Sequence, residues 1–538
     1  MRTSQNLNGV WSFGFYGEEI PAYPFVKATD FTSVPGCFDL IEPNCGKRGW
    51  AVYSRKVTCG GLVQLEIDGS GFVGNVWFDG KVIADLKHPY MPETFTFDAG
   101  NCGEHELAIV LNNEYNDQFH PFFDFYGYGG IYGDVTLTNV APDHVTRLYI
   151  STEDYKTGKL HIRCEAANNY SGSAKLVFDT GYQLEANFVN GAFEVDVTLP
   201  EFKLWSIEEP NLHTLTVILP EDEFTETFGI RTVETAGRKI LLNGKAIKLI
   251  GVNRHESHPE IGAAMPAQLI ATDLQLLKNA GYNYVRGSHY PQRKAMLELC
   301  DRMGIVVWEE TLGWGLKPEH MYNDAFLASQ REQVAKLTRA HFNHPCIIIR
   351  SFLNENASEE AGTPAIIQAL YDEIRAIDKH CLITFASNRY EKCLCTGIVD
   401  VVAMNPYPGW YDSNWETINT VPRVKPRLRE LSDAMPQDKP YLITEIGAEA
   451  LLGFRDPLKT YWSEEYQEEM LMAACEYTLE NDDCAGISIW HFADTRSYVS
   501  GKHIFGRARG FNNKGIVDEY RRPKMAWNAL KKLFTGNK

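Results

Sequence analysis

The sequence lacks several features, and each absence excludes a class of protein. No stretch approaches the roughly 20 apolar residues that a membrane-spanning helix needs. The first residues, MRTSQNLNGVWSFGF, contain no apolar segment or cleavage site of a secretory leader. The 12 cysteines include no Cys-x-x-Cys pair with zinc-site spacing. We therefore predict a cytoplasmic protein with reduced, mostly buried thiols, no bound metal and no cofactor.

Positive charge is also scarce. Lys and Arg total 52 against 70 Asp and Glu, which gives a net charge of −18. A field of that sign repels polyphosphates and anionic lipid surfaces. The sequence therefore argues against nucleic acid and membranes as partners. Aromatic residues are plentiful at 12%, and rings with a polar edge suit stacking on sugars as well as filling a core.

The order of patterns along the 538 residues predicts three domains. Residues 1–141 and 142–233, separated by a break near Pro142, consist of short β-rich runs between Gly, Asn, Asp and Pro. The spacing of strands and turns in the second region suits an immunoglobulin-like sandwich. Over residues 234–538 strands alternate with amphipathic helices, which indicates parallel βα units.

Eight strands are predicted in the last region, and eight is the number that closes a TIM barrel. Pro266, the spacing of Ile270, Leu274 and Leu277, and Gly281 mark the helix that follows the first of them. The predicted strands are 247–253, 283–288, 305–310, 347–355, 382–387, 401–407, 441–445 and 486–492.

Carboxylates and aromatic residues gather where these strands end, which is the active-site end of a TIM barrel. Glu355 ends the fourth strand and Glu445 the seventh, and these two strands face each other across the mouth. Two carboxyl groups flanking a glycosidic bond perform glycoside hydrolysis, and at a separation of about 5–5.5 Å one acts as nucleophile and configuration is retained. The alternative is that each glutamate sits in a structural ion pair.

Five runs in the sequence resemble glycoside hydrolase family 2: GVNRHE (251–256), VRGSHYP (285–291), DRMGIVVWEE (301–310), NHP followed by SFLNE (343–355), and ITEIGAE (443–449). The resemblance covers essentially the whole chain. It implies a jelly-roll sugar-binding domain over 1–141, an immunoglobulin-like β-sandwich over 142–233 and a catalytic (β/α)8 barrel over 234–538. It also implies Glu355, which follows Asn354, as acid/base and Glu445 as nucleophile.

The resemblance extends to the β-glucuronidase branch of that family through FFDFYGYGGIYGDV, MNPYPGWY, WHFAD and FNNKGI. It implies that Asp124 reaches the barrel mouth and that Asn512 and Lys514 grip the C6 carboxylate of a uronic acid. His289 is assigned to sugar hydrogen bonding or to support of its strand end. The other residues expected in the pocket are Asn354, Asn405, Tyr407, Trp410, Tyr411 and Trp490.

Charge supports a uronate site independently of the family. A protein of net charge −18 must offer local cations to hold an anion, and the segment 502–514 carries Lys502, Arg507, Arg509 and Lys514 without an acid. An ammonium and an amide satisfy carboxylate oxygens by charge-assisted hydrogen bonds. We include Arg509 among the candidate substrate contacts on this basis. The alternative is a solvated basic loop.

Two departures from the family pattern are visible. Arg350 stands where the family has Trp before the Ser of strand four, so its guanidinium either contacts the substrate, which would admit β-galacturonides differing at C4, or pairs with an internal glutamate. The connection GLKPEHMYND, between Trp314 and a helix near Ala325, is too short for a long lid over the mouth.

We predict a retaining hydrolase that cleaves terminal β-D-glucuronic acid from glucuronides and that also, or instead, acts on β-D-galacturonides. Its substrates are small-molecule or oligosaccharide uronides. Homo-oligomers are a further expectation. A β-galactosidase or β-mannosidase acting on neutral sugars, a carbohydrate-binding protein with a silent barrel, and a metal-dependent hydrolase are the alternatives.

Overall fold

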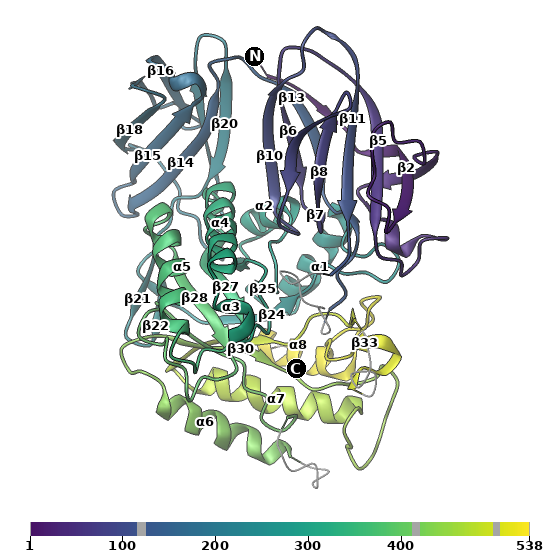
Figure 1. Ribbon diagram of the computed structural model, residues 1–538. Coiled ribbons are helices and arrows are strands. Elements are labelled where there is room, and N and C mark those ends of the chain that lie inside the picture. Colours follow the sequence, from purple (N-terminus) through teal and green to yellow (C-terminus); the bar gives the residue numbers. More distant parts are fainter. Residues whose placement is uncertain (1, 116–124, 412–419, 499–505, 537–538) are drawn as a thin grey trace.

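The computed structural model describes residues 2–115, 125–411, 420–498 and 506–536. Figure 1 shows two β-sheet regions side by side and a barrel with its surrounding helices below them. Among the described residues, no helix combines the length and apolarity required to cross a membrane.

Antiparallel sheets form the N-terminal region, and two of them enclose its core. Alternate residues of one central strand, Leu107, Ile109 and Leu111, point into that core, while Ala108 and Val110 on its other face are buried in a smaller cluster. The first sheet is β1 (Thr3–Asn6), β13 (Val135–Asn139), β6 (Leu62–Asp68) and β10 (Pro92–Asp98). The second is β3 (Asp30–Val34), β2 (Gly9–Gly17), β5 (Trp50–Cys59), β11 (Gly103–Asn112), β8 (Val73–Phe78) and β9 (Lys81–Leu86). A small third sheet is β4 (Gly36–Cys37), β12 (Gly130–Ile131) and β7 (Ser70–Gly71).

Two further antiparallel sheets share a separate core after Pro142. One is β14 (Val145–Asp154), β15 (Lys159–Ala166) and β18 (Ala192–Thr198). The other is β17 (Gln183–Phe188), β16 (Gly172–Phe178), β19 (His213–Ile218) and β20 (Glu223–Phe228). A short sheet of β21 (Val233–Ala236), β22 (Lys239–Leu242) and β23 (Lys245–Ile247) leads into the barrel. Domain boundaries at 141 and 233 stay our proposal.

Eight parallel strands close the predicted barrel. They are almost completely buried, as expected of parallel strands covered by helices on the outside. In order they are β24 (Leu249–Arg254), β25 (Tyr284–Gly287), β26 (Val306–Glu310), β27 (Ile347–Asn354), β28 (Leu382–Ser387), β29 (Val402–Met404), β30 (Tyr441–Ile446) and β31 (Cys484–Ile489). The sixth strand is shorter than predicted because Pro406 and Pro408 lack the N–H that pairing requires.

Helices follow the strands as the sequence predicts. In α1 (Ala267–Asn279) the buried face is Ile270, Leu274 and Leu277, and Gly281 with φ 88° ends the turn after it. The other helices are α2 (Lys294–Met303), α3 (Pro318–Met321), α4 (Asp324–Ala340), α5 (Thr363–Ile377), α6 (Val424–Ala434), α7 (Glu464–Glu480) and α8 (Met525–Thr535). Only the one-turn α3 lies between Trp314 and α4, so this connection is as short as expected.

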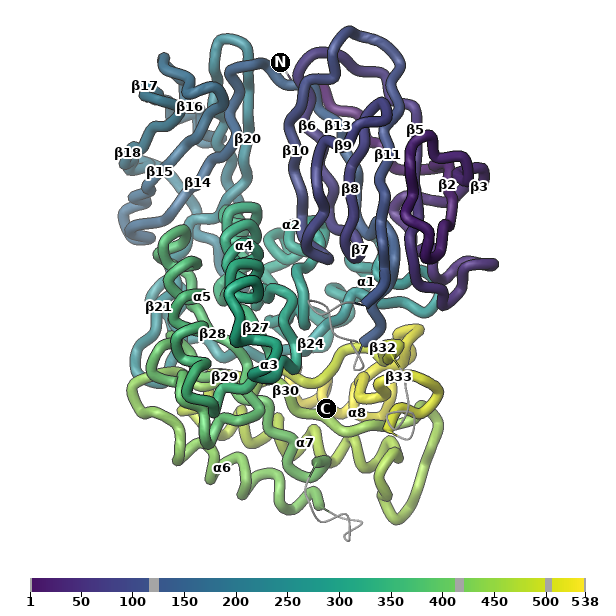
Figure 2. The backbone as a smooth tube through the Cα atoms, in the orientation of Figure 1, coloured from purple at the N-terminus to yellow at the C-terminus, as the bar shows by residue number. Residues whose placement is uncertain are grey.

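The N-terminal region packs on the end of the barrel where the strands finish. Tyr90 stacks on Tyr290, which follows β25, with ring centroids 4.0 Å apart. The Tyr126 amide donates to the Arg496 carbonyl at 2.7 Å, and Arg496 belongs to β32 (Thr495–Arg496), which pairs with β33 (Phe511–Asn512). Figure 2 shows this pair close to the lower end of β11. The barrel mouth therefore has residues of both regions around it.

Candidate active site

The centre of the barrel mouth is a buried arginine that joins five strands. Arg286 on β25 donates to Glu310 (2.9 Å), Glu445 (2.8 Å), Asn253 (3.0 Å) and Asn354 (2.8 Å). These partners lie on β26, β30, β24 and β27, so the guanidinium lies inside the barrel. A planar fork of N–H donors suits several carboxylate and amide oxygens at once.

Glu445 lies at the end of β30 and is only 4% exposed. Its Oε1 accepts from Arg286, and its Oε2 accepts from the Tyr407 hydroxyl at 2.9 Å. Burial and the neighbouring Glu355 carboxylate raise the pKa of Glu445 to about 8, while Arg286 and Tyr407 act in the opposite sense. The Glu445 carboxyl group therefore keeps its proton to a higher pH than a free glutamate does. Both donors face Glu445, so they stabilise its ionised form once that proton has left.

Glu355 follows β27 in an uncommon backbone conformation. Its φ is 51°, in the left-handed region that costs a non-glycine residue about 1 kcal/mol or more. Its amide donates to the Ala386 carbonyl on β28. The Asn405 amide donates to Glu355 Oε1 at 3.0 Å and to Asn354 Oδ1 at 3.1 Å. The sequence predicted these three residues in one site, and the structure brings them together.

Aromatic rings surround this carboxylate pair. His289 accepts or donates through Nδ1 at 3.0 Å from Glu310, and its ring stacks on Trp490 with centroids 5.0 Å apart. Tyr411 packs edge-on against Tyr407 at 5.1 Å. Flat rings beside paired carboxylates are suited to a sugar ring.

The predicted carboxylate-binding residues are Asn512, the last residue of β33, and Lys514, close to these rings. The Lys514 ammonium lies 5.2 Å from the Tyr411 ring centroid and 5.6 Å from that of Trp410. Tyr411 contacts Tyr407 and Tyr407 bonds Glu445, so two neighbouring rings connect Lys514 to the nucleophile candidate. Asn512 is fully buried, and within the described chain its Nδ2 donor has no hydrogen-bond partner.

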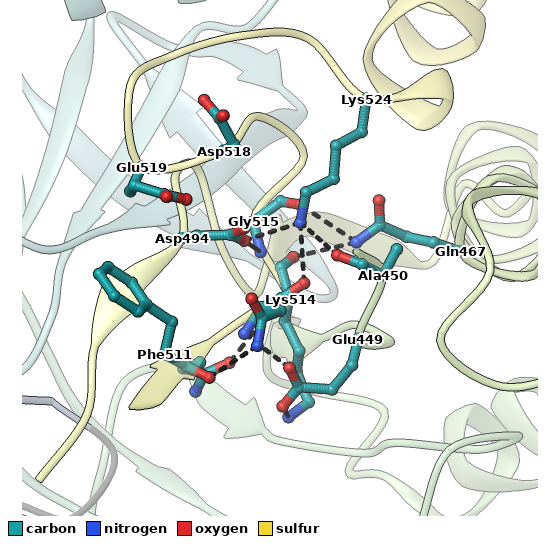
Figure 3. A network of polar contacts seen from close by, with 12 residues as sticks. Glu449, Ala450, Gln467, Asp494, Phe511, Lys514, Gly515, Asp518, Glu519 and Lys524 are labelled. Atoms are coloured by element: carbon teal, nitrogen blue, oxygen red, sulfur yellow. Dashed lines mark hydrogen bonds and ion pairs between the residues drawn. The ribbon is translucent and has the colours of Figure 1, made fainter. Parts of the chain in front are cut away.

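Lys514 also has a buried carboxylate partner that the sequence analysis missed. Its Nζ lies 2.9 Å from Glu449 Oε1, and Figure 3 shows the two side chains pointing toward each other beneath a second buried lysine, Lys524. Lys524 bonds Asp494 at 2.7 Å and the carbonyl oxygens of Ala450 and Asn513. The lysine pair fixes the loop after β33 to the loop after β30.

Two candidate substrate contacts lie elsewhere. Arg350 bonds Glu309 at 2.6 Å, Asp378 at 3.1 Å and the His341 carbonyl at 3.1 Å. His341 and Asp378 end α4 and α5, so Arg350 points to the helices outside the barrel, and its expected substrate contact is corrected to the alternative internal pairing. Arg509 bonds Glu519 at 2.9 Å and Asn513 Oδ1 at 2.8 Å. It therefore contacts the residue between Asn512 and Lys514, and its guanidinium is paired with these protein groups.

The remaining predictions have mixed outcomes. Asp124 lies outside the described residues. All 12 cysteines are free, and most are buried, as predicted. In the ranges that the structure describes, no three His, Cys, Asp or Glu side chains gather as metal ligands would. Arg286 was missed as a site residue, although a charge inside an apolar barrel strand is a signal that could have found it.

Comparisons with known proteins agree with this geometry. The family model "Glycosyl hydrolases family 2, TIM barrel domain" matches residues 233–538, and "Glycosyl hydrolases family 2" matches residues 143–231. The chain belongs to glycosyl hydrolase family 2. A family 2 β-galacturonidase from Eisenbergiella tayi has a similar structure, with a TM-score of 0.92, 31% identity and coverage of 100% of this chain and 97% of that one.

Relatives named β-glucuronidase match over a similar length. A β-glucuronidase of Faecalibacterium prausnitzii superposes with a TM-score of 0.89 and 25% identity, covering 100% of this family 2 chain and 98% of its own. The β-glucuronidase of Sus scrofa is 27% identical over an alignment of 608 positions, gaps included. The alignment covers 99% of this chain and 90% of the relative. With the family shown and both carboxylates in the barrel mouth, the protein is a glycoside hydrolase.

Proposed function

We propose that this family 2 member hydrolyses terminal β-D-glucuronic or β-D-galacturonic acid residues with retention of configuration. The observation that carries the proposal is the buried pair of Asn512 and Lys514 beside the glutamates, because Asn512 Nδ2 is a buried donor without a partner among the described residues. A substrate carboxylate would satisfy that donor and bond the ammonium. The β-galacturonidase and β-glucuronidases named above support this class of substrate.

The proposed reaction has two steps. Glu445 attacks the anomeric carbon and forms a glycosyl ester, while Glu355 gives its proton to the oxygen of the departing aglycone. Glu355, now a carboxylate, takes a proton from water, whose oxygen attacks the anomeric carbon and releases Glu445. Arg286 and Tyr407 hold Glu445 in the ionised form for the attack, and Asn405 orients Glu355.

The surroundings of the site extend the proposal. Tyr407, Trp410, Tyr411, Trp490 and His289 are the proposed pocket walls, and we assign Asp124 to the sugar hydroxyls on the family resemblance. With only α3 between Trp314 and α4, we propose that bulky aglycones and oligosaccharides reach the mouth. A cytoplasmic location and a homo-oligomer remain proposals.

The test is hydrolysis of the nitrophenyl β-D-glucuronide, β-D-galacturonide and β-D-galactoside side by side near neutral pH. Glu445→Gln is the blank, and its turnover should fall at least about 10³-fold while glucuronate still binds. Activity on either uronide without the galactoside supports the proposal, and the ratio of the two uronides gives the C4 preference. Activity on the galactoside alone would leave the glutamates in place and reject uronate recognition.

A further inference from the structure

A short buried segment connects the nucleophile candidate to the carboxylate-binding residues. Glu445 is the last but one residue of β30 and Glu449 lies four residues later, and both side chains are almost completely buried. Between them, a Cβ on Gly447 would lie 2.0 Å from the Trp490 carbonyl oxygen. The backbone is therefore packed directly against the end of β31, with no room for a side chain at that position.

Among the described residues, Glu449 accepts three hydrogen bonds, and each comes from the segment 507–514. Its Oε1 accepts from Lys514 Nζ and from Arg507 Nη1, both at 2.9 Å. Its Oε2 accepts from the backbone amide of Asn513 at 2.6 Å. Asn513 stands between Asn512 and Lys514, so the one carboxylate holds the ammonium and the backbone from which both proposed ligands project.

Backbone pairing reinforces this connection. The Ala450 amide donates to the Asn513 carbonyl at 3.0 Å, so the residue after Glu449 also pairs with the residue before Lys514. Two consecutive residues, Glu449 and Ala450, therefore both bond Asn513 and fix the position of one segment against the other.

Charge gives Glu449 a second effect. Two cations, Lys514 and Arg507, share this carboxylate. An ammonium alone in a buried pocket carries a large desolvation penalty, and a carboxylate alone would repel a uronate. With a second cation on Glu449, the ammonium is paired while the incoming anion still meets positive charge.

We propose that Glu449 is a positioning residue that sets the place of Lys514 and Asn512 relative to the nucleophile, and thereby makes the pocket specific for a uronate. The inference rests on the proposed uronide hydrolysis. Glu449 itself touches neither the sugar nor the reacting atoms, so it acts through Lys514 and the Asn513 amide.

Glu449→Gln removes the charge and one acceptor while keeping the shape. Kcat/KM for the favoured uronide should fall about 10–100-fold, mainly through KM, because charge-assisted hydrogen bonds to the ligand-bearing segment are lost. Glu464→Gln is the matched control, since Glu464 is a buried glutamate nearby whose carboxylate, within the described part of the chain, accepts from the backbone amides of Gly453 and Met525. It should stay within about 3-fold of wild type.

A double-mutant cycle with Lys514→Ala separates positioning from general damage. If Glu449 acts through Lys514, the double variant should be no more than about 3-fold worse than Lys514→Ala alone. The inference would be overturned if the losses in kcat/KM of the two single variants multiplied in the double variant. A Glu449→Gln enzyme with normal KM would overturn it as well. Should Glu449→Gln not fold, Glu449→Asp, which keeps the charge on a shorter side chain, should still raise KM more than kcat falls.

The same assays separate the two proposals. A wild-type protein that cleaves neither uronide rejects the proposed function. A wild-type protein that cleaves a uronide, with a damaging Lys514→Ala and a neutral Glu449→Gln, rejects only the role of Glu449.

Discussion

Arg286 Nη1 lies 2.8 Å from Glu445 Oε1, and both residues are buried inside the barrel. The same guanidinium bonds Glu310. Burial alone would raise the pKa of Glu310, but Arg286 and His289 lower it. Arg286 therefore bonds two carboxylates. It helps to keep Glu310 ionised, and it stabilises the ionised form of Glu445 that is needed for the attack. This difference between Glu310 and Glu445 leads to a measurable pH dependence.

The first prediction concerns stability against pH. Glu445 titrates near its ordinary value of 4.5 in the unfolded chain and near 8 when folded, so between these pH values the folded protein holds a proton that the unfolded chain has lost. The free energy of unfolding should fall as pH rises through this window. Glu445→Gln, which cannot ionise, should raise Tm by about 2–6 °C at pH 7.5, and the gain should shrink toward pH 5.

Thermal denaturation across pH 5–8 checks this prediction. Glu360→Gln, which alters an exposed glutamate near the site, is the control and should show no pH-dependent gain. A Glu445→Gln protein less stable than wild type at pH 7.5 would mean that the pair with Arg286 outweighs burial.

A second prediction tests Glu355 as proton donor. Glu355→Gln should lower kcat/KM about 10²–10⁴-fold for a uronide with a poor leaving group and far less for the dinitrophenyl uronide, whose leaving group needs no proton. The covalent sugar on Glu445 should then accumulate, since no base activates water, and intact-protein mass spectrometry would detect it. Equal losses on both substrates would contradict the assignment.

A third prediction concerns the cation in the pocket. Lys514→Ala should reduce kcat/KM for the favoured uronide at least about 10²-fold, because the charge-assisted bond to the substrate carboxylate is lost. Hydrolysis of a neutral galactoside, where measurable, should change little. Lys531→Ala on the exposed face of α8 is the control. An unchanged uronide activity would favour a neutral substrate.

A fourth prediction follows from the position of Arg350. Arg350→Leu leaves Glu309 and Asp378 without their buried partner and should destabilise the protein by about 3–5 kcal/mol. The ratio of glucuronide to galacturonide activity should stay within about 2-fold of wild type, since the side chain points away from the mouth. Arg350→Lys, which keeps the charge, gives the same ratio test in a more stable protein. A changed ratio would return Arg350 to the substrate pocket.

The barrel could be predicted from the sequence because buried parallel strands are short apolar runs that end in polar residues. Asn354, Glu355 and Glu445 were found in this way, and the structure places them at the predicted strand ends. Ile347–Ile349 and Tyr441–Ile443 show the pattern clearly, since every one of these residues is buried.

Arg350 shows why the direction of a side chain was not predictable. Simple alternation back from Asn354 would turn Arg350 into the barrel. The register of β27 against β28 shifts between Ser351 and Asn354, where Leu353 has φ 57°, and this irregularity reverses the alternation. Ser351 therefore faces Glu310 inside, and Arg350 faces the helices.

Glu449 gave no signal because it lies in a loop without a periodic pattern. Its importance depends on a contact across 65 residues, with Lys514, and on the backbone amide of Asn513. Contacts of that kind join loops that lie far apart in the sequence and adjacent in the folded barrel.

The stacking of Tyr90 on Tyr290 limits how the protein can be recombined with its relatives. Phe125 adds a second contact, with its ring centroid 4.9 Å from that of His255. A barrel excised on its own would expose these aromatic faces at the rim of its mouth. Exchanging the N-terminal region for that of another family member would also change the residues at the rim of the barrel mouth. A chimera should therefore take both regions from the same parent if its selectivity is to be kept.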